Sequence, residues 1–169
     1  STDDFRRMVP IALKGRRFAL LASVFVVASC GLAYELVAGA LSSYLLGDSV
    51  TQFSTVIGTY LFAMGIGSWA SKHVDTRVAD RFVGIEIAIG LLGGLTAPFL
   101  FWVFSQPGAP FHFFLYWCVL MVGTMVGLEI PLVMRLLETE TSFKDLVSQV
   151  LSVDYLGSLA VSVAFPLIL

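Results

Sequence analysis

The sequence predicts an all-α integral membrane protein, a bundle of five transmembrane helices whose N-terminus lies in the cytoplasm. Hydrophobic residues make up 57% of the 169 residues, and charged residues make up only 13%. A soluble domain is typically about half apolar and a quarter charged, so this composition places the chain in the membrane class. Two further observations give the spans and their orientation, namely five long apolar runs and a very uneven distribution of basic residues.

Five segments are long enough to cross a bilayer, because a transmembrane helix needs about 20 mainly apolar residues. The segments are residues 18–46, 51–71, 82–104, 111–137 and 146–169. The first and fourth exceed the minimum, so we expect tilt, a kink or an interfacial end in them. The loops between the segments are the polar stretches LGDSVTQ, KHVDTRVADR, SQPGAP and LETETSFKD.

All ten lysines and arginines fall ahead of the first span, after the second span, or around the end of the fourth. They are Arg6, Arg7, Lys14, Arg16, Arg17, Lys72, Arg77, Arg81, Arg135 and Lys144. Because cytoplasmic loops carry the excess of basic residues, this pattern predicts a cytoplasmic N-terminus and a last span that ends near the outer face. Residues 1–17 then form a basic segment, either lying along the inner membrane surface or disordered, and residues 18–169 form the five-helix transmembrane module.

Residues that bind metals or perform catalysis do not occur here in a recognisable pattern. Cys30 and Cys118 lie in apolar runs, where a cysteine usually behaves as a small buried hydrophobe. His73 and His112 stand alone, and there is no CxxC pair. We therefore expect no metal site and no catalytic residue in this chain, and we expect lipid rather than nucleic acid around it.

Small residues recur at four-residue spacing within the predicted spans. Helices in lipid associate by close approach of their backbones, so such residues indicate packing faces. The candidates for helix packing are Gly31, Gly39, Ala63, Gly67, Gly90, Gly94, Gly123 and Gly127. They predict a compact bundle and, less strongly, a homo-oligomer.

Four carboxylates fall inside the predicted spans, at Glu35, Glu86, Glu129 and Asp154. A carboxylate near the bilayer centre costs roughly 2.5–3.5 kcal/mol on insertion scales, so intramembrane acids usually have a purpose. At about 1.5 Å per residue, the last three share a layer near the cytoplasmic side, and Glu35 lies further out. Two interpretations remain open. The acids either hydrogen-bond to freed backbone groups, hydroxyls and inner arginines, or they line a cavity that attracts cations.

The membrane-embedded spermidine synthases of bacteria, which are polyamine aminopropyltransferases, are similar to this chain in four stretches that occur in order. These are YELVAGALSSYLLGDSVTQFSTVIGTYLFAMGIGSWAS, EIAIGLLGGLTAP, GLEIPLVMRLLE and SVDYLGSLAVSVAFPLIL, and the resemblance covers about residues 17–169. The family's membrane motifs fall on Tyr34, Glu35, Gly47, Ser49, Gly65, Gly67, Ser68, Gly127, Glu129, Pro131, Arg135, Asp154, Tyr155 and Gly157. Glu86 matches a further acidic position of that family.

The resemblance implies a multi-pass protein of the bacterial inner membrane and a C-terminal aminopropyltransferase domain that uses decarboxylated S-adenosylmethionine. The glycine-rich turn after a strand that such a domain needs is absent from this sequence. We therefore expect these residues to be either part of a longer protein or a membrane module without the enzyme.

The leading functional hypothesis is a membrane module that anchors an aminopropyltransferase domain outside this chain. Its acids would gather polyamines electrostatically. The alternative is a non-enzymatic accessory or structural subunit that packs against a larger membrane complex. A small cation or proton carrier is the weakest hypothesis, because five spans without an internal repeat do not form the paired halves of a transporter.

Overall fold

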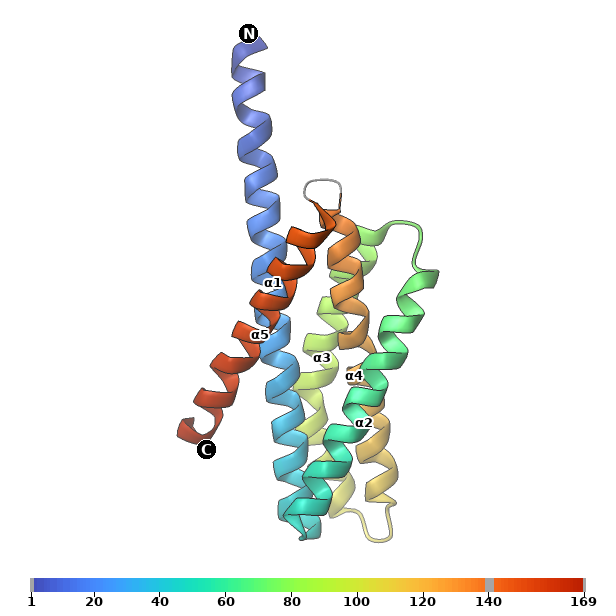
Figure 1. The fold of residues 1–169 in the computed structure, drawn as a ribbon. Coiled ribbons are helices and arrows are strands. Elements are labelled where there is room, and N and C mark those ends of the chain that lie inside the picture. Colours follow the sequence, from blue (N-terminus) through green and yellow to red (C-terminus); the bar gives the residue numbers. More distant parts are fainter. Residues whose placement is uncertain (1, 139–141, 169) are drawn as a thin grey trace.

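The computed structural model describes residues 2–138 and 142–168, with side chains from residue 15 onward. This part of the chain is all-helical (Figure 1). The elements are α1 (Thr2–Leu46), α2 (Ser49–Ala70), the 3-10 helix η1 (Ser71–His73), α3 (Val78–Ser105), α4 (Phe111–Leu137) and α5 (Phe143–Ile168). The five α-helices are long and apolar enough to cross a membrane. The predicted all-α fold with five apolar spans is therefore confirmed.

The first helix is longer than the first predicted span. α1 begins at Thr2 and runs without a break to Leu46. The basic segment is thus continuous with the apolar helix from Thr2 onward, and it projects beyond the other helices (Figure 1). α5 crosses α1 obliquely and then runs away from the bundle (Figure 1).

A two-residue turn joins α1 to α2. Gly47 and Asp48 both have positive φ, 74° and 48°, a conformation that glycine adopts at least cost. The Asp48 carboxylate caps α2, accepting from the Thr51 hydroxyl at 2.7 Å and from the Thr51 amide at 3.3 Å. These two hydrogen bonds hold the pKa of Asp48 below its ordinary value. The turn therefore makes α1 and α2 antiparallel neighbours.

The closest helix contact is between α2 and α4. A Cβ placed on Gly67 would lie 2.0 Å from the carbonyl oxygen of Thr124, and one on Gly127 would lie 2.1 Å from a carbonyl oxygen of α2. A Cβ on Gly123 would lie 2.8 Å from that of Ala63. The two backbones are thus as close as glycine permits. In a lipid bilayer the hydrophobic effect does not drive helices together, so such close packing is what holds them.

α1 contacts α2 and α5 through small residues as well. A Cβ on Gly31 would lie 2.9 Å from the Tyr60 hydroxyl oxygen, and one on Gly39 would lie 2.6 Å from the Phe53 ring. On the other side of α1, a Cβ on Gly157 of α5 would lie 2.5 Å from a main-chain oxygen of α1. α1 therefore joins the α2–α4 pair to α5.

α3 is placed differently from the other helices. It packs mainly against α4. A Cβ on Gly90 or Gly94 would meet no atom within 4 Å. These two glycines therefore have no packing partner in the described part of the chain, and they line a hollow between α1 and α3.

The α2–α4 contact predicts a strong position dependence for alanine on α2. Gly67→Ala should lower the unfolding free energy by about 1–3 kcal/mol, because its methyl group overpacks the interface. Gly65→Ala is the matched control on the same helix, since a Cβ there meets nothing within 4 Å. Alanine favours a helix over glycine by about 0.5–1 kcal/mol, so the control should be neutral or slightly stabilising. Thermal unfolding in detergent micelles measures both, and equal effects would contradict the close contact.

Candidate functional site

The four intramembrane acids come from four different helices. Glu35 lies on α1, Glu86 on α3, Glu129 on α4 and Asp154 on α5. Glu129 is only 2% exposed, and the other three are partly buried. The fifth helix, α2, contributes Tyr60, which is 3% exposed. All five helices therefore bring a polar side chain to the interior.

Glu129 interacts electrostatically with two other carboxylates, Glu86 and Asp154. Its Oε1 atom is buried and has no hydrogen-bond partner, and the same is true of Oε1 of Glu86. Ser23 of α1 lies beside the Glu86 carboxylate. Glu86 and Asp154, the two acids predicted to share a layer with Glu129, are thus within electrostatic range of it. One oxygen of Glu86 and one of Glu129 are unsatisfied.

Tyr60 connects this group to the fourth acid. It interacts electrostatically with Glu35 as well as with Glu129 and Asp154. Its hydroxyl is buried against Gly31 of α1 and has no hydrogen-bond partner. We call Glu35, Glu86, Glu129, Asp154 and Tyr60 the acidic cluster.

In the sequence alone, Tyr60 is one of several hydroxyls that an acid could use. The other hydroxyls lie elsewhere: Thr55 bonds to Thr51 and Tyr116, and Tyr155 is 66% exposed. The signal that singles out Tyr60 is its position one helical turn before Ala63 and two turns before Gly67. This position is on the face of α2 that packs against α4.

Three arginines form hydrogen bonds to groups outside the acidic cluster. Arg17 donates to the side chain of Gln149, Arg135 donates to the Val74 carbonyl at 3.0 Å, and Arg16 donates to a main-chain carbonyl near the end of α4 at 2.7 Å. These contacts tie α1, α4, α5 and the α2–α3 loop together at one end of the bundle (Figure 1). A buried carboxylate is stable only when it is paired, hydrogen-bonded or neutralised. The carboxyl groups of the cluster therefore need either protons or a bound cation to be neutral.

A metal ion is a poor fit for the cluster. Within residues 15–138 and 142–168, no three His, Cys, Asp or Glu side chains are arranged to hold one. Protons or singly charged groups do not require such a set of ligands around one point.

Comparison with known proteins shows which proteins are similar in sequence to this chain. The chain is 60% identical over 152 residues to polyamine aminopropyltransferase 2 of Ralstonia nicotianae, covering 89% of this chain and 30% of that protein. It is 51% identical over 149 residues to the polyamine aminopropyltransferase of Leptospira interrogans, covering 88% of this chain and 30% of that one. It is 39% identical over 171 residues to polyamine aminopropyltransferase 2 of Streptomyces coelicolor, with 95% and 31% covered. No family model and no solved structure matches.

The homology is to the N-terminal part of these relatives. The chain is a membrane module of the polyamine aminopropyltransferase family. It spans about 30% of the length of the curated relatives it matches. The resemblance seen in the sequence is thereby confirmed.

The convergence of the acids predicts non-additive mutational effects. Glu129→Gln and Asp154→Asn should couple by roughly 0.5–3 kcal/mol in unfolding free energy, because removing one charge relieves the repulsion that the other experiences. Asp80, in the first turn of α3, is exposed. Glu129→Gln with Asp80→Asn is therefore the control pair, and it should be additive to about 0.5 kcal/mol. A double-mutant cycle by denaturant unfolding measures both pairs, and additivity in the first would refute the electrostatic contact.

Proposed function

We propose that this chain is the inner-membrane anchor of a polyamine aminopropyltransferase, with its N-terminus in the cytoplasm. The observation that carries the proposal is the match of 89% of this chain to the N-terminal 30% of proteins with that name. The aminopropyl donor implied by the family, decarboxylated S-adenosylmethionine, would bind outside this chain. The hollow between α1 and α3 is lined almost entirely by apolar side chains, which do not fit a ribose and a charged sulfonium.

The distribution of charge supports this orientation. The N-terminal part of α1, the α2–α3 loop and the α4–α5 connection lie at one end of the bundle, and the other two connections lie at the opposite end (Figure 1). All ten lysines and arginines belong to the first group. The positive-inside rule therefore assigns that end to the cytoplasm.

We propose further that the acidic cluster binds the ammonium groups of a polyamine. A polyamine carries several positive charges separated by short methylene chains, so it can meet carboxylates on successive helical turns. The unsatisfied buried oxygens of Glu86 and Glu129 support this assignment, as does Tyr60 between Glu129 and Glu35. An acidic interior next to an aminopropyltransferase would raise the local concentration of the amine substrate.

The orientation is testable by cysteine labelling. In a chain with Cys30→Ala and Cys118→Ala, a single cysteine at Gln106 should react with a membrane-impermeant maleimide in intact spheroplasts. A cysteine at Thr76 should react only after lysis. Both positions are exposed in loops at opposite ends of the bundle. The opposite labelling pattern would reverse the proposed orientation.

Polyamine binding is testable with spermidine on the purified chain in nanodiscs. Glu129→Gln with Asp154→Asn should weaken spermidine binding, measured by calorimetry, on the order of tenfold or more, because charge-assisted hydrogen bonds are lost. Asp75→Asn with Asp80→Asn removes the same charge from exposed positions in the α2–α3 connection and the first turn of α3, and it should leave the affinity unchanged. Equal weakening in both double variants would mean non-specific attraction, and no weakening would eliminate the cluster as the site.

A further inference from the structure

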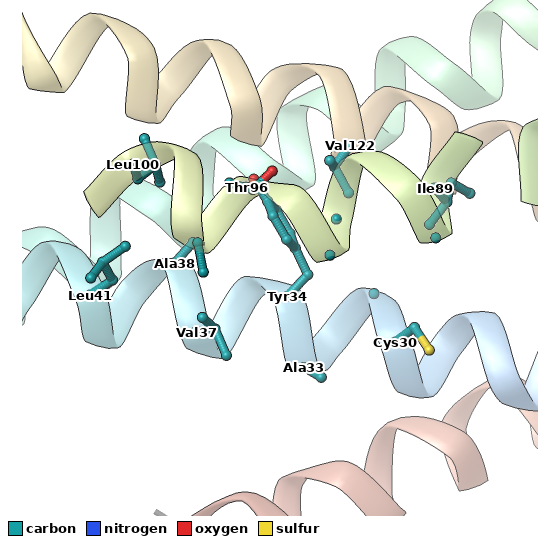
Figure 2. A pocket seen from close by; sticks show the side chains of 15 residues that line it. Cys30, Ala33, Tyr34, Val37, Ala38, Leu41, Ile89, Thr96, Leu100 and Val122 are labelled. Carbon is teal, nitrogen blue, oxygen red and sulfur yellow. The ribbon is translucent and has the colours of Figure 1, made fainter. Parts of the chain in front are cut away.

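Two hollows follow one another along the space between α1 and α3. Figure 2 shows the first, of about 400 Å³, which has Cys30 and Ile89 at one end. The second, of about 410 Å³, shares Cys30, Ile89 and Gly90 with the first and extends to Ala19 on α1 and Glu86 on α3. We call the second one the Glu86 hollow. Its volume is within the range of about 300–1,000 Å³ that is typical of ligand pockets.

Of the described residues that line the Glu86 hollow, one is charged. The Ser23 hydroxyl lies beside the Glu86 carboxylate, and the other lining residues are alanine, valine, isoleucine, cysteine and glycine. A serine hydroxyl can satisfy one carboxylate oxygen, but it brings no positive charge. Oε1 of Glu86 is buried and has no hydrogen-bond partner. Charge complementarity therefore favours a cation as the occupant of this hollow.

The basic residues that precede this hollow in the sequence are directed elsewhere. Arg81 comes five residues before Glu86 on α3, which is a rotation of about 140° around the helix, and its side chain is exposed. Arg17 of α1 donates to the side chain of Gln149 on α5. Neither arginine therefore takes the place of a cation in the hollow.

The hollow lies near the end of the bundle that we assign to the cytoplasm. Glu86 is about 8 Å along α3 from Arg81, and Ser23 is about 9 Å along α1 from Arg17. Ala19 and Ala22, which line the hollow on α1, are exposed. A water-soluble cation can therefore reach the Glu86 carboxylate from the cytoplasmic side without crossing the centre of the bilayer.

Glu86 connects this hollow to the acidic cluster. It is partly exposed and lines the hollow, whereas its electrostatic neighbour Glu129 is 2% exposed and does not line it. Oε1 of Glu129 is also without a hydrogen-bond partner. The contacts of α2 with α4, and of α1 with α2 and α5, are closed by glycines, whereas α1 and α3 are separated beside Glu86. A cation that enters the hollow therefore meets Glu86 before it meets Glu129.

We propose that the Glu86 hollow is the place at which a polyamine enters the acidic cluster from the cytoplasmic end. This inference rests on the proposed binding of a polyamine by that cluster. A terminal ammonium group binds the Glu86 carboxylate and the Ser23 hydroxyl oxygen, and the methylene chain packs against the apolar wall. The next ammonium group of the polyamine is then directed toward Glu129. The hollow thus suits a slender cation in which charged and apolar parts alternate.

The test measures how well spermidine protects an introduced thiol in phosphatidylcholine nanodiscs. In a chain with Cys30→Ala and Cys118→Ala, Ala22→Cys places a thiol on the wall of the Glu86 hollow, at an exposed position. Spermidine at about ten times the Kd measured by calorimetry should slow the reaction of this thiol with N-ethylmaleimide about tenfold, because only the empty chain reacts. Mass spectrometry gives the labelled fraction over time.

Two matched variants show whether the protection is specific. Ile87 follows Glu86 directly and is 59% exposed, but it does not line the hollow, so Ile87→Cys should react equally fast with and without spermidine. Glu86→Gln in the Ala22→Cys chain should reduce the protection to about twofold or less, since glutamine keeps the shape but loses the charge-assisted hydrogen bond. Asp80→Asn, at an exposed position in the first turn of α3, should leave the protection intact.

The outcomes separate the entrance from the polyamine site itself. If the chain binds spermidine by calorimetry while labelling of Ala22→Cys is unaffected, the entrance is overturned and the acidic cluster remains the proposed site. Protection that survives Glu86→Gln, or that occurs equally at Ile87→Cys, would also overturn the entrance. If the unmodified chain does not bind spermidine at all, both proposals are wrong.

Discussion

The backbone contact between α2 and α4 is the constraint on which the rest of the structure depends. Glycine at Gly67, Gly123 and Gly127 lets the two helices meet main chain to main chain. That contact sets the separation of Tyr60 and Glu129, which lie on the facing sides of the two helices near the same glycines. A methyl group at the interface would move the two helices apart and shift both polar groups. The small residues therefore determine the geometry of the acidic cluster as well as the packing.

The placement of charge follows from a second constraint, the cost of leaving ions in hydrocarbon. The basic side chains are kept at one end, where Arg16, Arg17 and Arg135 bond across helices and fasten the bundle. The acids are kept in the interior, away from those contacts. This separation leaves the interior with negative charge that a mobile cation or a proton can neutralise. Acidic side chains without basic ones in the interior are not needed to anchor a protein in a membrane. Their presence therefore favours a role in binding a cation or a proton.

The two tyrosines at the centre face different environments. The rings of Tyr34 and Tyr60 are 6.3 Å apart between centroids. Tyr60 belongs to the acidic cluster, whereas the Tyr34 side chain lines the hollow between α1 and α3. The two rings therefore connect the acidic cluster to the wall of that hollow.

The sequence by itself determined the fold class, the five spans and the polar loops, because the length and apolarity a helix needs to cross a bilayer are local properties. It also located the four acids and the basic residues, since one-dimensional position along a span gives depth. It did not determine which helices touch. Glycine spacing looks the same at Gly90 and Gly94 as at Gly123 and Gly127, yet the first pair faces a groove and the second pair a helix. Likewise, Tyr34 and Tyr60 both lie in apolar stretches of sequence, and the sequence does not say which neighbour each one faces. That depends on the rotation of each helix about its axis. That rotation is set by close packing among all five helices, so only the tertiary structure decided where their hydroxyls lie.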